Sequence, residues 1–297
     1  MNHIKDQIRC GAAYRLGLTG KGIGVAVLDT GIFLHRDFDS RVTGFADMVN
    51  GKTFAYDDCG HGTHICGIIG GSGRMSGGRY SGIAPGCDLV MVKVLDRKGN
   101  GYSSDVLAGI SWILERKEKL GIRILNISVG ACSKRGMSEN SALVKGVNRA
   151  WDAGLVVVVA AGNNGPRTMS ITTPGISRKV ITVGCSDDDR EVLVGGNRMV
   201  DYSGRGPTAA CICKPDLVAP GCSVVSCSSR ADKYTIKSGT SMSTPIVSGA
   251  VALLLERFPD MTNKDVKLRL RESSVDIGLP RNQQGWGLLD VGKMLER

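Results

Sequence analysis

The chain of 297 residues has no hydrophobic run long enough to cross a membrane, no internal repeat and no low-complexity segment. Its longest apolar stretch, around residues 155–161, falls far short of the roughly 20 residues that a membrane-spanning helix needs, and it reads better as a buried strand. The first residues carry charges and lack the apolar segment of a signal peptide. We therefore expect no membrane partner and a cytoplasmic location, or a secreted protein if a leader has been removed.

The charge balance points to an ordinary solvated surface. The chain holds 38 Lys and Arg against 28 Asp and Glu, a formal net charge of +10. Because acidic residues are interleaved with the basic ones along the sequence, no concentrated basic face for nucleic acid is indicated. We expect no nucleic-acid partner.

The chain contains ten cysteines, and many of them fall in segments that read as buried, such as Cys66, Cys87 and Cys185. A domain of this length can bury a large core and needs no disulfide staples. Reduced thiols in a reducing compartment are therefore the preferred state, in agreement with a cytoplasmic location. Cys211 and Cys213 form a Cys-x-Cys pair, which without further ligands is weak evidence for a metal or redox site.

Strand-like and helix-like segments alternate along the chain. Near-continuous apolar strands such as residues 156–159 predict burial on both faces, and hence a parallel sheet covered by helices. Strands are expected at 24–28, 89–95, 123–128, 155–160, 180–184 and 216–219, and helices at 61–70, 103–119, 138–153, 241–257 and 263–273. The glycine-rich and charged loops at 70–78 and 187–197 are expected to face solvent. The sequence predicts an α/β fold, a three-layer α/β/α sandwich with a mainly parallel central sheet, as a single domain over 1–297 with a short lead-in at 1–20.

Three polar motifs stand where buried segments begin or end. Ser241 lies just ahead of a long helix of small and apolar residues, where free N–H groups and the helix dipole favour negative charge. Asp29 ends an apolar strand, and parallel sheets collect functional residues at the carboxyl ends of their strands. His61 opens a glycine-rich segment of helix length. Taken alone, each residue is explained more simply as a helix cap, a turn aspartate or a buried histidine.

Taken together and in this order, the motifs resemble those of the subtilisin-like serine proteases. The matching stretches are Asp29-Thr30-Gly31, His61-Gly62-Thr63-His64, Ala160-Ala161-Gly162-Asn163-Asn164-Gly165 and Gly239-Thr240-Ser241-Met242-Ser243-Thr244-Pro245. The similarity runs from about Gln7 to Leu295, and it implies a subtilisin-like fold. Since the similarity begins within a few residues of Met1, an intracellular-type bacterial branch of the family is expected.

The resemblance gives each of these residues a chemical role. Ser241 would attack the peptide carbonyl to form an acyl-enzyme, His61 would act as general base and then general acid, and Asp29 would orient His61. Asn163 and the backbone N–H of Ser241 would form the oxyanion hole. The chain is expected to be a serine endopeptidase that acts on protein or peptide substrates and requires no cofactor for catalysis.

Two further segments are expected to bind the extended substrate, as their counterparts do in similar proteases. The first segment comprises Gly99, Asn100, Gly101 and Tyr102, and the second comprises Ser128, Val129 and Gly130. The specificity pocket would be walled by Val129, Gly130, Ala160, Ala161 and Gly162. Because this lining is small and apolar, it favours a large apolar side chain at P1, the substrate residue before the scissile bond.

No metal site is expected near these motifs. His61 and His64 lie three residues apart, but further ligands are not evident, and the resemblance makes His64 a structural histidine. Members of the family often hold calcium in the loop after this helix. Here that loop, residues 70–80, is basic and carries no carboxylate, so the usual calcium ligands are lacking. A structural calcium elsewhere is compatible with the sequence.

Two other function classes fit parts of the sequence. A pseudoprotease would keep the fold for binding, but it usually lacks a member of the triad, whereas Asp29, His61, Asn163 and Ser241 are all present. A nucleotide-binding module would place a glycine-rich loop after a strand, whereas residues 20–24 precede one. Covalent labelling of the serine by a fluorophosphonate separates the protease from both.

Overall fold

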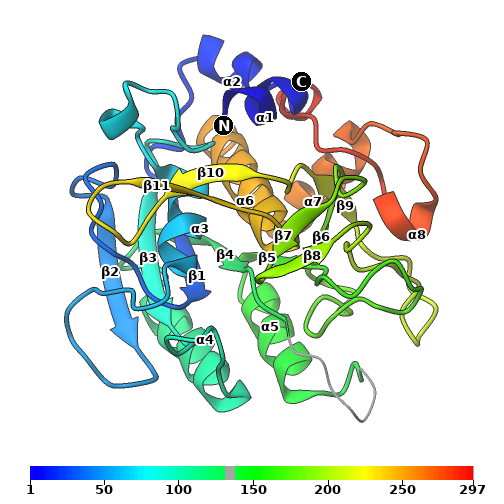
Figure 1. Cartoon of the computed structure of the whole chain (residues 1–297), viewed down its shortest axis with the longest axis horizontal. Coiled ribbons are helices and arrows are strands. Elements are labelled where there is room, and N and C mark those ends of the chain that lie inside the picture. Colours follow the sequence, from blue (N-terminus) through cyan, green and yellow to red (C-terminus); the bar gives the residue numbers. More distant parts are fainter. Residues whose placement is uncertain (131–137, 297) are drawn as a thin grey trace.

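The computed structural model describes residues 1–130 and 138–296, and its centre is a seven-stranded sheet (Figure 1). The strand order is β2-β3-β1-β4-β5-β6-β9, and every neighbouring pair is parallel. The strands are β1 Gly24–Asp29, β2 Val42–Asp47, β3 Asp88–Lys93, β4 Ile122–Ile127, β5 Val156–Ala160, β6 Ile181–Cys185 and β9 Leu217–Ala219. The strand order reverses at β1, and crevices at such points are where open parallel sheets bind ligands.

The centre of the sheet is buried on both faces. Every residue of β1, β5 and β6 is buried, including the four consecutive valines 156–159. Branched side chains of this kind suit a pleated surface that packs on both sides. The sequence pattern therefore predicted the burial of these strands correctly.

Helices cover the two faces of the sheet and complete three layers (Figure 1). On one face, α3 (His61–Gly70) and α6 (Thr240–Arg257) pack against the strands and against each other. On the other face lie α4 (Ser103–Arg116) and α5 (Ala142–Asp152). The three-layer α/β/α architecture predicted from the sequence is confirmed.

Both ends of the chain join the same core. The lead-in expected at residues 1–20 contains α1 (Asn2–Gln7) and α2 (Gly11–Arg15), and it lies beside the C-terminal segment in Figure 1. Ile4 and Ile8 are fully buried, and the Val291 N–H donates to the Ile8 carbonyl at 2.8 Å. The last elements of the chain are α7 (Asn263–Ser273), α8 (Arg281–Gln284) and α9 (Val291–Met294).

The predicted strands and long helices are all present, with shifted ends. The helix expected from residue 138 begins at Ala142, because the Ser141 side chain caps it by accepting the Val144 N–H. The sequence did not indicate β2, the short terminal helices, or two hairpins, β7–β8 (Val192–Val194, Asn197–Met199) and β10–β11 (Val224–Cys227, Tyr234–Lys237). The first hairpin replaces part of the solvent-facing loop that we expected at 187–197.

Among the described residues, no helix has the length and hydrophobicity needed to cross a membrane. Nine cysteines are present as free thiols, and those at positions 10, 66, 87, 185, 222 and 227 are buried. The tenth, Cys132, lies outside the described residues. The described thiols are thus unpaired, as the sequence interpretation favoured.

Candidate active site

The buried carboxylate of Asp29 holds the imidazole of His61. Asp29 is the last residue of β1 and is fully buried, while His61 is the first residue of α3. His61 Nδ1 lies 2.8 Å from Asp29 Oδ1 and 2.9 Å from Oδ2, and the Thr30 N–H donates to Oδ1 at 2.7 Å. This arrangement leaves Nε2 as the ring nitrogen that can exchange a proton with a substrate or nucleophile.

The carboxylate of Asp57 joins the segments that carry Asp29 and His61. Its Oδ1 accepts the Thr30 hydroxyl at 2.9 Å and the Gly60 N–H at 2.8 Å. Its Oδ2 accepts both the N–H and the hydroxyl of Thr63, at 2.9 and 2.6 Å. Asp57 therefore satisfies free N–H groups at the start of α3 and fixes the helix against the end of β1. We did not predict this role, although an acid just ahead of a helix is a recognisable capping signal.

A buried lysine stabilises the segments next to Asp29. Lys93, at the end of β3, is fully buried and pairs in register with Asp29. Its ammonium donates to the backbone carbonyls of Thr30 at 2.6 Å and Leu95 at 2.7 Å, and it forms an ion pair with Asp58 at 2.8 Å. A buried charge is tolerated when all its hydrogen bonds are satisfied, as they are here.

The electrostatics of His61 are set by opposing effects. Burial alone disfavours the imidazolium, but the charge of Asp29 and its hydrogen bond more than compensate, so the pKa of His61 is raised above its usual value. Lys237, whose side chain lines the same cleft, acts in the opposite direction and lowers this pKa.

Ser241 is the second residue of α6 and lines the same cleft as His61. Gly239 precedes the helix with φ of 140°, a conformation that favours glycine and turns the chain sharply into α6. The Ser241 hydroxyl donates to the Ser128 carbonyl at 2.6 Å rather than to His61. The structure thus brings the two side chains to one cleft without a hydrogen bond between them, and catalytic hydrogen bonds often tighten only when a substrate binds.

The amide of Asn163 is oriented by the start of α6. Its Oδ1 accepts both the N–H and the hydroxyl of Thr240, each at 3.0 Å. Because the oxygen is occupied, the amide NH₂ group is left to donate from the wall of the cleft beside Ser241. A side-chain N–H in this position can stabilise an oxyanion, as the sequence comparison implied.

The cleft around these residues has a volume of about 460 Å³. Its walls include four of the five predicted pocket residues, Val129, Gly130, Ala160 and Gly162, together with Ser128 of the predicted substrate-binding segment. Ala161 is fully buried and does not line the cleft; its carbonyl accepts the Thr172 N–H at 2.9 Å. Thr172, which we did not predict, completes the wall because its side chain lies against Gly130 and Gly162.

A neighbouring groove brings together the two segments expected to bind substrate. Gly99, Asn100, Gly101 and Tyr102 lie on one side of it, and Val129 and Gly130 on the other. The groove has a volume of about 220 Å³ and an apolar floor that includes Leu95, Ile127 and Leu143. Tyr102 stands at its rim with 78% of its surface exposed.

A third groove, on the opposite side of His61 and Ser241, was not predicted. The two unpredicted hairpins form it, with Leu193 and Met199 from β7–β8 and Ile236 from β11. Leu193 and Ile236 are each 62% exposed. Exposed apolar side chains beside a catalytic cleft are typical of a binding surface, but their spacing within short irregular segments gave no sequence signal.

His64 points away from the cleft and is a structural residue. Its Nε2 lies 3.1 Å from the Val224 carbonyl and 3.2 Å from the Thr235 carbonyl, so it ties α3 to the β10–β11 hairpin. Burial lowers the pKa of His64 to about 3, and the positive charge of Lys237 adds to this effect. The imidazole is therefore neutral in the folded protein at all ordinary pH values.

This shift predicts that acid destabilises the fold through His64. In the unfolded chain the imidazole takes up a proton near pH 6.5, which the folded protein cannot do until about pH 3. The free energy of unfolding should therefore fall as the pH drops below about 6.5, by up to roughly 1.4 kcal/mol per pH unit from this residue. Urea denaturation at about pH 5, 6 and 7 measures the slope.

His64→Gln should flatten that slope, whereas His3→Gln, at an exposed histidine, should leave it unchanged. An equal slope in wild type and His64→Gln would contradict the assignment of His64 as a neutral buried residue.

Comparison with known proteins agrees with this geometry. The model of the subtilase family matches residues 20–287. Serine protease AprX of Bacillus subtilis (strain 168) is 42% identical over 290 residues, which cover 92% of this chain and 65% of AprX. This chain therefore spans 65% of the length of that relative. Subtilisin Savinase of Lederbergia lenta is 34% identical, with 96% of this chain and 95% of Savinase covered.

Two solved structures are also similar. A cold-adapted subtilisin-like serine proteinase has a TM-score of 0.75 and 29% identity, covering 92% of this chain and 90% of that one. Sphericase has a TM-score of 0.77 and 31% identity, covering 92% and 93%. The chain therefore belongs to the subtilase family of serine proteases.

Proposed function

We propose that this chain is a serine endopeptidase that cleaves peptide bonds in proteins through an acyl-enzyme at Ser241. The observation that carries the proposal is that Ser241, His61 and Asn163 line one cleft, with Asp29 fixing the imidazole from behind. These groups supply a nucleophile, a base and an oxyanion donor in a member of the subtilase family.

The reaction follows from these positions. His61 Nε2 takes the proton of Ser241 as Oγ attacks the carbonyl carbon of the substrate, and the negative charge moves to the carbonyl oxygen. The Asn163 amide and the Ser241 backbone N–H donate to that oxygen. The C–N bond then breaks and His61 gives its proton to the leaving amine. Water, deprotonated by His61, releases the acyl group and restores Ser241. No cofactor takes part in these steps.

The hydrogen bond between Ser241 and Ser128 links substrate binding to the alignment of the nucleophile. In the free protein the Ser128 carbonyl accepts the Ser241 hydroxyl at 2.6 Å. A substrate backbone N–H that binds the same carbonyl would displace the hydroxyl, which can rotate toward His61. Binding of an extended peptide would therefore help to align the nucleophile.

The cleft walls support a preference for apolar side chains at P1. Val129, Ala160 and the methyl group of Thr172 present small apolar surfaces, and none of the described residues that line the cleft is acidic. The cleft also contains Lys98, next to Gly99, and Lys237, at the end of β11, which are not neighbours of Val129, Ala160 or Thr172 in the sequence. A charged P1 side chain would lose its hydration without gaining a partner.

The central experiment is labelling with a fluorophosphonate. We expect one covalent adduct on Ser241 by mass spectrometry, and none in Ser241→Ala or His61→Ala, because the hydroxyl needs a base to react. Each of these variants should lose roughly a million-fold in turnover, and Asn163→Ala about 100- to 1,000-fold, magnitudes taken from subtilisins as a class. Thermal melting of each variant verifies that it is folded. A folded wild-type protein that is neither labelled nor active on casein would instead be a binding protein with a subtilase fold.

The pH profile should report the charge of Lys237. Its positive charge lowers the pKa of His61, so Lys237→Gln should raise that pKa. Since only neutral His61 acts as a base, the acidic limb of kcat/KM should move to higher pH, and by more at low salt than at high salt. Lys233→Gln, at an exposed residue just before β11, the strand that ends at Lys237, is the matched control. A limb that stays in place or moves to lower pH would rule out this coupling.

Peptide anilides that differ only at P1 test the pocket. Phe or Leu at P1 should give kcat/KM values at least about tenfold above those for Asp or Lys, because the walls gain contact with an apolar side chain and leave a charge unpaired. A preference for Lys or Arg would instead show that an acidic group reaches the pocket on substrate binding.

A further inference from the structure

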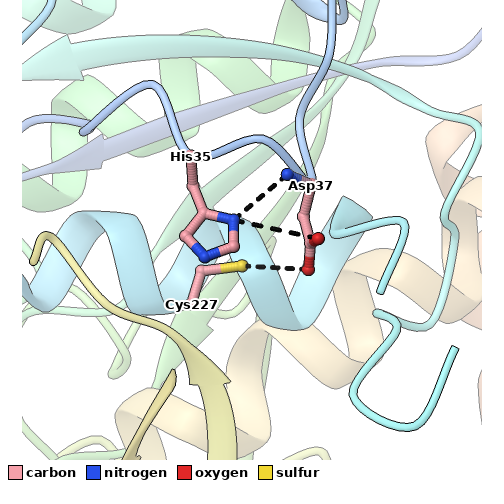
Figure 2. Close-up of side chains that lie close together, drawn as sticks. All are labelled: His35, Asp37 and Cys227. Atoms are coloured by element: carbon pink, nitrogen blue, oxygen red, sulfur yellow. Dashed lines mark hydrogen bonds and ion pairs between the residues drawn. The ribbon is translucent and has the colours of Figure 1, made fainter. Parts of the chain in front are cut away.

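Three buried side chains outside the active site converge on one point. His35 and Asp37 lie in the loop after β1, and Cys227 is the last residue of β10. At most 1% of the surface of each residue is exposed. Figure 2 shows the ring of His35 and the sulfur of Cys227 both facing the carboxylate of Asp37. One nitrogen, one oxygen and one sulfur atom, from residues far apart in the sequence, lie within 4.8 Å of one another.

The spacing of these atoms suits a small metal ion. Cys227 Sγ lies 3.7 Å from Asp37 Oδ2, and His35 Nδ1 lies 3.9 Å from Asp37 Oδ1. Ligands around a tetrahedral ion, bound at about 2.0–2.3 Å, are roughly 3.3–3.8 Å apart. The ligand atoms, which lie within 4.8 Å of one another, must therefore move inward to close the site around an ion. Nδ1 also accepts the Asp37 backbone N–H at 3.1 Å, so that bond must open if Nδ1 is the nitrogen that binds.

Two features of the cluster lack an explanation in the protein alone. Among the described residues, His35 Nε2 is buried with no hydrogen-bond partner. The Asp37 carboxylate accepts the Met75 N–H at 2.9 Å, the Tyr234 hydroxyl at 2.7 Å and the Cys227 thiol at 3.7 Å, all of them neutral donors. No lysine or arginine of the described chain forms an ion pair with this carboxylate. Buried carboxylates are usually paired with a cation or bind a metal.

The ligand types distinguish between metals. Calcium requires six to eight oxygen ligands, whereas this cluster offers an imidazole and a thiol beside a single carboxylate. The neighbouring loop at 70–80 presents the Met75 N–H to Asp37 rather than an oxygen. A mixed nitrogen, oxygen and sulfur set of this size is typical of zinc.

We propose that His35, Asp37 and Cys227 bind one Zn²⁺ ion, which joins the loop after β1 to the β10–β11 hairpin. The thiol proton of Cys227 passes to solvent as the S–Zn bond forms, and a water molecule completes the tetrahedron. Tyr234, whose hydroxyl donates to Asp37, keeps the carboxylate oriented toward the ion.

The position of the site gives the metal a structural role. The loop that bears His35 begins directly after Asp29, and β11 leads within a few residues to Ser241. A metal bound here would brace the aspartate segment of the triad against the serine segment. A surface ion pair between Arg36 and Asp232, at 2.8 Å, joins the same two loops.

Cobalt substitution tests the proposal on the full-length chain. Ser241→Ala protein, stripped with a chelator, should bind one equivalent of Co²⁺ and show a sulfur-to-cobalt charge-transfer band. Zinc should displace the cobalt and raise the melting temperature, whereas calcium should do neither. The band should be lost in Cys227→Ala and His35→Gln. It should persist in Cys66→Ala, at a buried cysteine of α3 outside the cluster, and in Cys185→Ala, which removes a thiol from a separate Cys185, Asp187 and Cys222 group.

Tyr234→Phe provides a milder variant in case the cluster substitutions do not fold. It should lower zinc affinity about 10- to 100-fold while keeping one equivalent bound at saturation. Folded protein without a charge-transfer band, or a band that survives Cys227→Ala but disappears in Cys185→Ala, would overturn the proposal. Unchanged zinc affinity in Tyr234→Phe would also count against the proposed arrangement of Asp37.

Discussion

The site depends on the parallel alignment of the central strands. β1, β4 and β5 run side by side in one direction, so their carboxyl ends, at Asp29, Ile127 and Ala160, meet at one edge of the sheet. Each of the loops that follow contributes to the cleft, and α6 brings Ser241 to the same edge from behind. Reversal of any of these strands would separate groups that must lie within hydrogen-bond reach.

The sequence predicted the parts of the molecule that leave a local signal. The apolar runs of β1 and β5 are long enough to identify as buried strands; Asp29 ends one of them, and His61 and Ser241 lie at the start of buried helices. Lys93 and Thr172 left no comparable signal, because each acts through partners that are distant along the chain. Asp57 left a capping signal ahead of α3, but its bond to Thr30 could not be read from the sequence. The hairpins were missed because strands of three or four residues show no clear periodicity. The cytoplasmic location stays a prediction.

The charged side chains buried near the cleft all have hydrogen-bond partners. Asp29 and Lys93 are fully buried at adjacent strand ends, and each is satisfied by partners that belong to the next segment of the site. The hydrogen bonds of Asp57 connect these segments in turn. Removing one such group would leave another buried polar atom unpaired, so that local substitutions would disturb distant parts of the site.

The contact of Gly130 and Gly162 with Thr172 limits how this enzyme could evolve. A Cβ atom added at either glycine would lie 2.2 to 2.4 Å from the threonine side chain. An exchange at Gly130 would therefore require a smaller residue at 172 first, whereas Gly162, with φ of 92°, would be strained by any side chain. Changes of the side chains along this wall would therefore be contingent on the order in which mutations arise.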